Sequence, residues 1–260
     1  MSAPTYTEKR IGYLGLSQLL DESSDILMLV TNSIKRDLLA KESYVVALGL
    51  TAIAEVSTAE MCRELYPDVK KLMKSSSPYI RQRACLAAVR TIKNIPDTIE
   101  DFIDIIAELI KDQSQSVVMA CVTLMNEICK VDAQFAKHFR KHLATLIKML
   151  KSLLMSGYAP EYEIGGVKDP FLQVKILEIM GRIGQGNSEA SDEMSDILAQ
   201  IATNTDNTKH PGNSVLAECV RTIMLIEASQ GLRVLGINIL GKFLANKENN
   251  VRYVALQQLI

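Results

Sequence analysis

Two histidines in this chain, His138 and His142, have a spacing that could serve metal chemistry. On a helix, residues four apart point to the same side, so both imidazoles could reach one zinc ion. No glutamate follows His138, and the sequence offers no third ligand nearby. We therefore interpret the two histidines as a surface pair and expect no metal site.

A glycine-rich run, Gly181-Arg182-Ile183-Gly184-Gln185-Gly186, superficially resembles a nucleotide-binding loop. Its glycine spacing differs from that of phosphate-binding motifs, and it follows a helical pattern where such a motif follows a strand. The run is typical of a helix C-terminus. The sequence also lacks a P-loop and a Ser-His-Asp signature. We expect neither a cofactor nor an enzymatic activity.

Five cysteines lie singly within apolar helical patterns and form no C-x-x-C pair. This pattern favours small buried side chains in a reducing compartment over a redox or metal role. There is no N-terminal signal sequence, and no apolar run reaches the roughly 18 residues that a spanning helix needs. We expect a cytoplasmic protein that can visit a membrane surface. The cysteines are Cys62, Cys85, Cys121, Cys129 and Cys219.

The strongest local charge feature is a basic group within a predicted long helix from Phe135 to Ser156, which contains no acidic residue. One interpretation is a solvated face that pairs with the acidic helix from Thr98 to Lys111. The other is a docking surface for an acidic partner or for membrane headgroups, where each basic residue contributes up to about 1 kcal/mol. A net charge of -1 predicts no global attraction to nucleic acid. The candidate surface residues are Lys137, Arg140, Lys141, Lys148 and Lys151.

The elements that carry these residues are predicted to be helices. The hydrophobic content is 48%, yet aromatic residues make up only 5% and tryptophan is absent, which is typical of helix-on-helix packing. The segment Gly231 to Leu259 predicts two apolar helices with a short polar turn between them. The segment Tyr44 to Val56 is apolar nearly all round, so its helix must lie between neighbours.

Several helix starts carry a capping signal. Ser57-Thr58-Ala59-Glu60 fits the capping box, while Ser77-Pro78 and Asp169-Pro170 place a polar cap before a proline at the first helical position. The segment Gly157 to Lys168 contains two adjacent glycines and a proline, so it predicts a loop that breaks the pattern.

Helices of similar type begin about 34 to 55 residues apart, at Ser43, Ser77, Ser114, Asp169, Asn213 and Asn249. This spacing and the two-helix unit are typical of degenerate HEAT or armadillo repeats. We predict an all-α solenoid over residues 1-260, with about six helix-pair repeats and the break at 157-168. The first helix is already apolar and the pattern continues to Ile260, which indicates a fragment of a longer array.

Six segments then resemble the N-terminal trunk of the adaptins, collinearly over about residues 8 to 260. The segments Asp196 to Lys209 and Gly231 to Leu244 resemble the gamma type in particular. The others are Lys9 to Gly15, Met155 to Tyr158, Asp169 to Leu177 and Asn250 to Leu256.

This resemblance implies a right-handed solenoid that forms part of a heterotetrameric clathrin adaptor complex. Its implied partners are a beta-adaptin, a medium (mu) chain, a small (sigma) chain and an Arf-family GTPase, with clathrin and accessory proteins bound through regions absent here. It also implies recruitment to membranes by a phosphoinositide, the capture of sorting signals, and peripheral membrane association at the trans-Golgi network and endosomes. The alternative is a general HEAT-repeat scaffold or transport receptor that binds a small GTPase.

Overall fold

In the computed structural model, which describes residues 3-20, 26-155 and 161-259, the chain divides into two compact units. Unit 1 spans Met1–Asp132 and unit 2 spans Ala133–Ile260. Both units consist of antiparallel helix pairs, so the predicted all-α solenoid class is confirmed. The count of about six repeats in one array stays a prediction.

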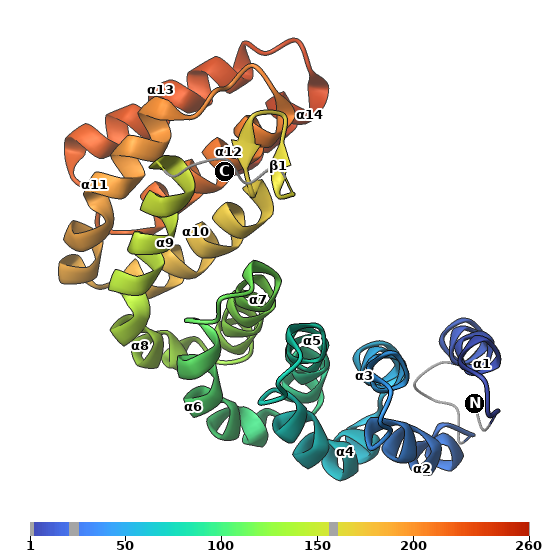
Figure 1. The fold of residues 1–260 in the computed structure, drawn as a ribbon. Coiled ribbons are helices and arrows are strands. Elements are labelled where there is room, and N and C mark those ends of the chain that lie inside the picture. Colours follow the sequence, from blue (N-terminus) through green and yellow to red (C-terminus); the bar gives the residue numbers. More distant parts are fainter. Residues whose placement is uncertain (1–2, 21–25, 156–160, 260) are drawn as a thin grey trace. The chain divides into compact units, whose positions relative to one another are not determined.

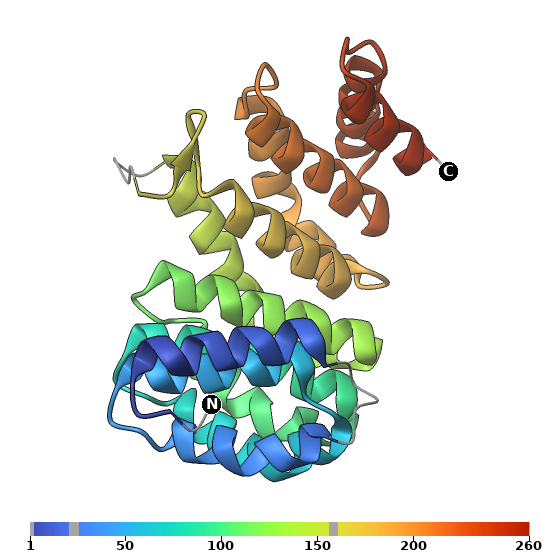
Figure 2. The ribbon, with the colours of Figure 1, turned by 90° about the vertical axis from the view of Figure 1, so that its right-hand side faces the viewer.

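Unit 1 has two layers of helices (Figures 1 and 2). In the first layer α1 packs on α3, α3 on α5, and α5 on α7. In the second layer α2 packs on α3, α4 on α5, and α6 on α7. The elements are α1 (Tyr6–Leu19), α2 (Ile26–Leu38), α3 (Ser43–Val56), α4 (Ala59–Leu72), α5 (Pro78–Asn94), the 3-10 turn η1 (Pro96–Thr98), α6 (Ile99–Leu109) and α7 (Gln115–Val131).

Unit 2 repeats this two-layer arrangement. Helices α10, α12 and α14 form one layer, and α9, α11 and α13 form the other. The elements are η2 (Ala133–Phe135), α8 (Ala136–Phe139), η3 (Arg140–His142), α9 (Leu143–Met155), β1 (Glu163–Ile164), β2 (Val167–Lys168), α10 (Pro170–Gly184), α11 (Ser188–Asn204), α12 (His210–Leu225), α13 (Gln230–Leu244) and α14 (Asn249–Leu259).

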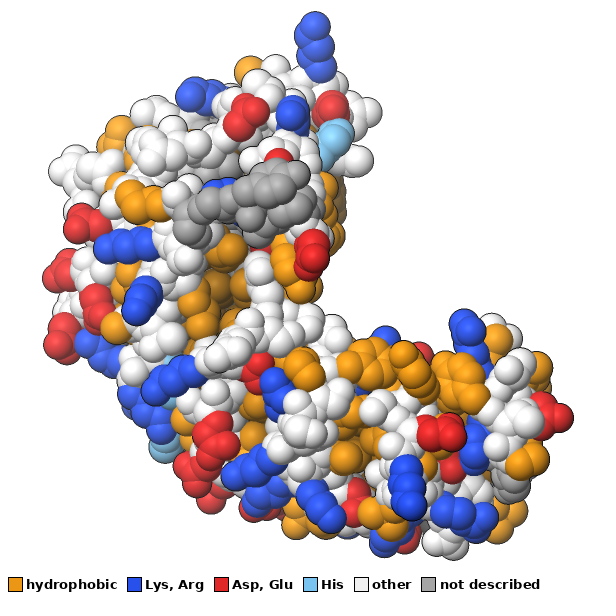
Figure 3. All heavy atoms as spheres, in the orientation of Figure 1, with side chains coloured by type: hydrophobic (Ala, Val, Ile, Leu, Met, Phe, Trp, Pro, Cys, Tyr) orange, Lys and Arg blue, Asp and Glu red, His pale blue; other side chains and the backbone are white. Residues whose placement is uncertain are grey.

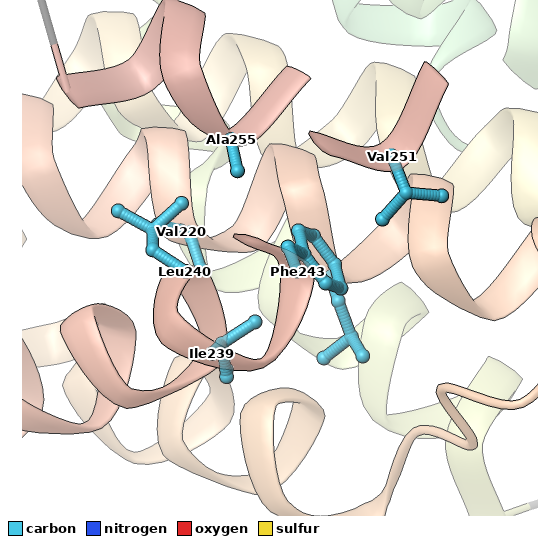
Figure 4. Close-up of a cluster of buried hydrophobic side chains, with 7 residues drawn as sticks. Val220, Ile239, Leu240, Phe243, Val251 and Ala255 are labelled. Atoms are coloured by element: carbon cyan, nitrogen blue, oxygen red, sulfur yellow. The ribbon is translucent and has the colours of Figure 1, made fainter. Parts of the chain in front are cut away.

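The predicted helix pair at Gly231 to Leu259 is confirmed as α13 and α14, and its core is drawn in Figure 4. Phe243 from α13 and Val251 from α14 are buried together with Val220 from α12. Three helices thus share one apolar cluster, because neither α13 nor α14 could bury its apolar face alone.

The predicted long basic helix is wrong as a single element. The structure divides it into α8, the 3-10 turn η3 and α9. Phe139 and Leu143 are both buried, one before and one after the turn. A 3-10 turn has three residues per turn, so the break also changes which side chains share a face.

Two further boundaries differ from the prediction. The predicted loop at 157-168 contains an antiparallel hairpin in which Glu163 pairs with Lys168, and Gly165 and Gly166 form its turn with positive φ values. Helix α12 begins at His210, three residues before the predicted start, because Pro211 takes the first turn of the helix.

Glycines inside helices permit close helix contact at some positions and not at others. A Cβ at Gly49 would lie 3.1 Å from Leu38 Cδ2, and one at Gly236 would lie 3.2 Å from Met224 Cε, so these glycines do permit close helix contact. At Gly15 and Gly241 a Cβ would meet nothing within 4 Å, so no close contact requires glycine there.

Candidate interaction surface

The predicted basic residues lie on the first elements of unit 2. Lys137, Lys141, Lys148 and Lys151 are exposed, and none of these four ammonium groups forms an ion pair with a described residue. Lys148 and Lys151 share one face of α9, because residues three apart are neighbours on a helix. Figure 3 shows basic side chains and a histidine gathered over α8.

Arg140 differs from the four lysines, because it is half-buried and engaged. Its Nη2 lies 3.0 Å from Glu189 Oε2, and its Nη1 donates to Asn187 Oδ1 at 3.0 Å. Asn187 is also the N-cap of α11, where its side chain accepts from the Ala190 N–H. Arg140 therefore ties the turn η3 to the start of α11, and we assign it a structural role. The four lysines, which we call the lysine surface, remain the candidate binding residues.

The predicted acidic helix is α6, and it forms ion pairs with α4 and with the residues directly after α4. Asp101 Oδ1 lies 2.6 Å from Lys70 Nζ, and Glu108 Oε1 lies 3.6 Å from Lys74 Nζ. All four side chains are well exposed, so these pairs contribute at most about 1 kcal/mol each.

The two histidines lie in different environments. His138 is exposed and its ring centroid lies 5.6 Å from that of Phe135, whereas His142 is buried beside the core. The prediction of a surface pair is therefore wrong for His142. Within residues 3-20, 26-155 and 161-259 there is no group of three His, Cys, Asp or Glu side chains that could hold a metal.

All five cysteines are buried free thiols, as predicted. Burial raises the pKa of Cys85 to about 12, with Asp112 adding to the effect, and burial likewise raises the pKa of Cys219 to about 12. The reactive species of cysteine is the thiolate, so these thiols are inert at neutral pH.

Sequence reasoning missed a row of three exposed tyrosines in unit 1. The rings of Tyr6 and Tyr44 have centroids 6.1 Å apart, and so do the rings of Tyr44 and Tyr79. The guanidinium of Arg83 lies 5.6 Å from the Tyr79 centroid. These tyrosines begin α1, α3 and α5, so their separation by one repeat period was the available signal. Exposed tyrosines are enriched in protein interfaces.

Buried polar contacts hold the helices that present these surfaces. Lys9 Nζ donates to Asp37 Oδ1 at 2.6 Å and Tyr13 Oη donates to Asp37 Oδ2 at 2.8 Å, which joins α1 to α2. Burial, with the Asp37 hydrogen bond, raises the pKa of Tyr13 well above its ordinary value. Arg81 of α5 forms a fork with Asp112, with N–O distances of 2.7 and 3.0 Å.

The described arrangement thus offers binding surfaces on a rigid helical frame. None of its helices, over the residues described, is both long and apolar enough to cross a membrane. The model of the adaptin N-terminal region matches residues 1–260, which is the whole chain.

The chain belongs to the adaptin family.

Named relatives of this adaptin agree with the predicted gamma type. The chain is 48% identical to AP-1 complex subunit gamma of Dictyostelium discoideum over 257 residues, covering 99% of this chain and 29% of the relative. It is 48% identical to AP-1 complex subunit gamma-2 of Arabidopsis thaliana, covering 100% of this chain and 30% of the relative. It is 44% identical to AP-1 complex subunit gamma-like 2 of Homo sapiens, covering 100% and 33%. This adaptin chain therefore spans about a third of the length of these relatives.

A homology model of the full-length AP-3 complex contains a chain with the same fold. The TM-score is 0.72 at 23% identity, with 99% of this adaptin and 42% of that chain covered. A crystal structure of an engineered protein also matches, with a TM-score of 0.57 at 17% identity, covering 99% and 65%. At these identities the likeness supports the helical solenoid fold alone.

Proposed function

We propose that this adaptin stretch is a scaffold within a heterotetrameric clathrin adaptor complex and acts by protein-protein binding in vesicle-mediated transport. The observation that carries the proposal is the match to the adaptin N-terminal region over all 260 residues, together with relatives whose names are gamma subunits of AP-1 complexes. In a solenoid each repeat contacts mainly its neighbours, so a long surface is left for partners. The proposed site of action is the cytoplasmic side of the trans-Golgi network and endosomes.

The proposed partners follow from the family. They are a beta-adaptin, a medium chain and a small chain, with recruitment by an Arf-family GTPase. Each unit supports such a role through exposed side chains of its own, namely the tyrosine row in unit 1 and the lysine surface in unit 2.

Co-expression with a sigma-type small chain, a beta-adaptin trunk and a medium chain, followed by affinity pull-down, tests the proposal. We expect the partners to be recovered in stoichiometric amounts. The same experiment with an unrelated HEAT-repeat protein in place of this chain is the control. If this chain recovered no adaptor subunit while it stayed soluble and helical, the proposed scaffold role of this stretch would be wrong.

We further propose that the lysine surface binds an acidic partner surface or anionic headgroups. Replacement of Lys137, Lys141 and Lys148 by Glu reverses three exposed charges and leaves the Arg140 contacts intact. We expect at least tenfold weaker binding to partner subunits or to anionic liposomes, because each basic residue near an anionic surface contributes about 1 kcal/mol. Replacement of Lys41, Lys71 and Lys111 by Glu, all exposed in unit 1 and without an ion pair to a described residue, is the charge-matched control. Unchanged binding by the lysine-surface variant would show that these lysines are only a solvated face.

A further inference from the structure

Unit 2 contains a small pocket beside the β1–β2 hairpin, with a volume of about 230 Å³. Its walls come from the end of α9, the hairpin turn, the start of α10 and the segment that follows α11. In Figure 1 the hairpin can be found by its β1 label. Ligand pockets for drug-sized molecules measure about 300 to 1,000 Å³, so this pocket suits a smaller group such as one end of a chain.

Two polar atoms in this pocket are buried and have no hydrogen-bond partner among the described residues: Gln173 Oε1 and Thr205 Oγ1. Gln173 is only 2% exposed, and its Nε2 donates to the Lys168 carbonyl at 2.6 Å, which fixes the amide with Oε1 as the unused acceptor. A buried polar atom without a partner costs about 1 to 3 kcal/mol. Such a pair of atoms is satisfied either by bound water or by a ligand that supplies both partners.

Two lysines give the pocket a positive charge. Lys168 and Lys209 line it, and neither ammonium forms an ion pair with a residue that the structure describes. Lys209 is held against the hairpin, since a Cβ at Gly165 would lie 3.6 Å from Lys209 Cδ and one at Gly166 would lie 4.0 Å from Lys209 Nζ.

One acidic group of the lining, Asp206, offsets part of this charge, because the charge of Lys209 adds to the Thr208 hydrogen bonds, the larger effect, in lowering the pKa of Asp206. The Asp206 Oδ1 accepts from the Thr208 N–H at 2.9 Å and its Oδ2 accepts from the Thr208 hydroxyl at 2.8 Å. These hydrogen bonds direct the Asp206 carboxylate into its own turn. Glu163 stands opposite Lys168 in the hairpin register and is exposed, outside the pocket lining.

The lining defines the chemistry of the ligand. Two ammonium groups and the Thr205 hydroxyl can donate to an anion, while Gln173 Oε1 requires a donor close to that anion. The dianion of a phosphate monoester supplies acceptors but no donor, and that of inorganic phosphate supplies at most one hydroxyl. The C-terminus of a peptide supplies both, because a carboxylate and an amide N–H belong to the same terminal residue. Leu153, Leu154 and Val167 form an apolar wall for its side chain.

We propose that this pocket binds the free carboxyl terminus of a partner polypeptide that ends in a small or medium aliphatic residue. The carboxylate accepts from Lys168, Lys209 and the Thr205 hydroxyl, and the N–H of the terminal residue donates to Gln173 Oε1. This binding mode is independent of the adaptor role proposed above.

Titration of the ¹⁵N-labelled chain with two tripeptides tests the proposal: acetyl-Gly-Gly-Leu with a free carboxylate, and the same peptide as a carboxamide. We expect the acid to bind with a dissociation constant on the order of 1 mM and to shift the amide signals of Gly165 and Gly166. We expect the carboxamide to bind at least about tenfold more weakly. Inorganic phosphate is the third probe, and we expect it to bind more weakly than the acid.

Two variants and two matched controls locate the binding. Thr205→Val and Lys209→Ala each remove one donor, and we expect each to weaken binding of the acid about tenfold. Thr203→Val, in the last turn of α11, and Lys242→Ala on an exposed face of α13 should bind as the wild type does. Equal binding of acid and carboxamide, no binding of the acid, or wild-type binding by Lys209→Ala would overturn the proposal. Phosphate binding as tight as that of the acid would show a bare anion site and would overturn it too.

Discussion

At the scale of single residues, Gly212 in the first turn of α12 packs closely against the loop that precedes this helix. A Cβ on Gly212 would lie 1.7 Å from the Asp206 carbonyl oxygen, which is backbone and cannot rotate away. We expect Gly212→Ala to lower the free energy of unfolding by about 3 kcal/mol, the upper part of the range for overpacking. Urea denaturation followed by circular dichroism measures this change.

The matched control is Gly241→Ala in the interior of α13, where an added Cβ would meet nothing within 4 Å. Alanine is the better helix former by about 1 kcal/mol, so this variant should be as stable as the wild type or more stable. A similar loss of stability in both variants would contradict the packing described around Gly212.

Replacement of either of two glutamates by glutamine should change the melting temperature at pH 7, in opposite directions for the two residues. Burial raises the pKa of Glu218, Arg221 lowers it and Glu178 raises it, with a net upward shift. Its charged form is therefore penalised in the folded state at neutral pH, and the penalty vanishes once the carboxyl is protonated in both states. We expect Glu218→Gln to raise the melting temperature at pH 7 and to have little effect near pH 4.

Glu127 is the comparison residue, because its pKa is shifted in the opposite direction. Burial would raise its pKa, but hydrogen bonds from Lys130 and Lys93 outweigh burial and lower it. Its stabilising contribution is present at neutral pH and is lost as the pH falls through the lowered pKa. Glu127→Gln should therefore lower the melting temperature at pH 7, with a smaller effect at low pH. The same sign for both variants at pH 7 would contradict the assigned environments.

The capping residues show what sequence can and cannot decide at this scale. Asp169 was predicted as an N-cap, and its Oδ1 accepts from the Leu172 N–H at 3.0 Å. The capping box assigned to Ser57 is wrong by one residue, because Thr58 caps α4 and the Ser57 hydroxyl donates to the Ile53 carbonyl. Both residues have a hydroxyl that could cap α4. The Ser57 hydroxyl is already bonded to the last turn of α3, which leaves Thr58 as the cap.

At the scale of elements, Arg81 joins three segments of unit 1. Its guanidinium binds both oxygens of Asp112, which follows α6, and donates to the Ser75 and Ser76 carbonyls before α5. Both charged side chains are largely buried. Removal of one partner of a buried pair leaves an uncompensated charge, so we expect Arg81→Ala to cost about 3 kcal/mol in unfolding free energy.

Lys70→Ala is the control, since Lys70 pairs with Asp101 at the surface and its loss should cost less than about 1 kcal/mol. Chemical denaturation of both variants measures the difference. If both substitutions lowered the free energy of unfolding equally, the contacts of Arg81 would not be what stabilises the loops before α5 and α7.

The elements themselves were largely predictable, because apolar periodicity fixes a helix over many residues. The exceptions have local physical causes. The basic segment was predicted as one helix, since its lysines and the buried pair Phe139 and Leu143, four residues apart, also fit a continuous helix. The hairpin at Glu163 to Lys168 is too short to produce an alternating pattern.

At the scale of the whole molecule, the fold class, the family and the residues of the lysine surface were predictable from sequence, but the tyrosine row and the pocket were not. Collinear segments spread over the chain identified the adaptin resemblance, and the match over residues 1–260 confirms it. The tyrosine row depends on contacts between successive repeats, and the pocket beside the hairpin brings together residues from α9 to the segment after α11. Such sites exist only after the repeats stack.

The most direct test of the scaffold account is amide hydrogen exchange of this chain, alone and after co-purification with a sigma-type small chain. The account predicts added protection over one contiguous set of exposed helix faces that includes the α8–α9 lysine surface, with unchanged exchange in buried helices such as α5 and α12. A small chain that co-purifies but leaves the exchange of every helix unchanged, or one that fails to co-purify, would contradict it.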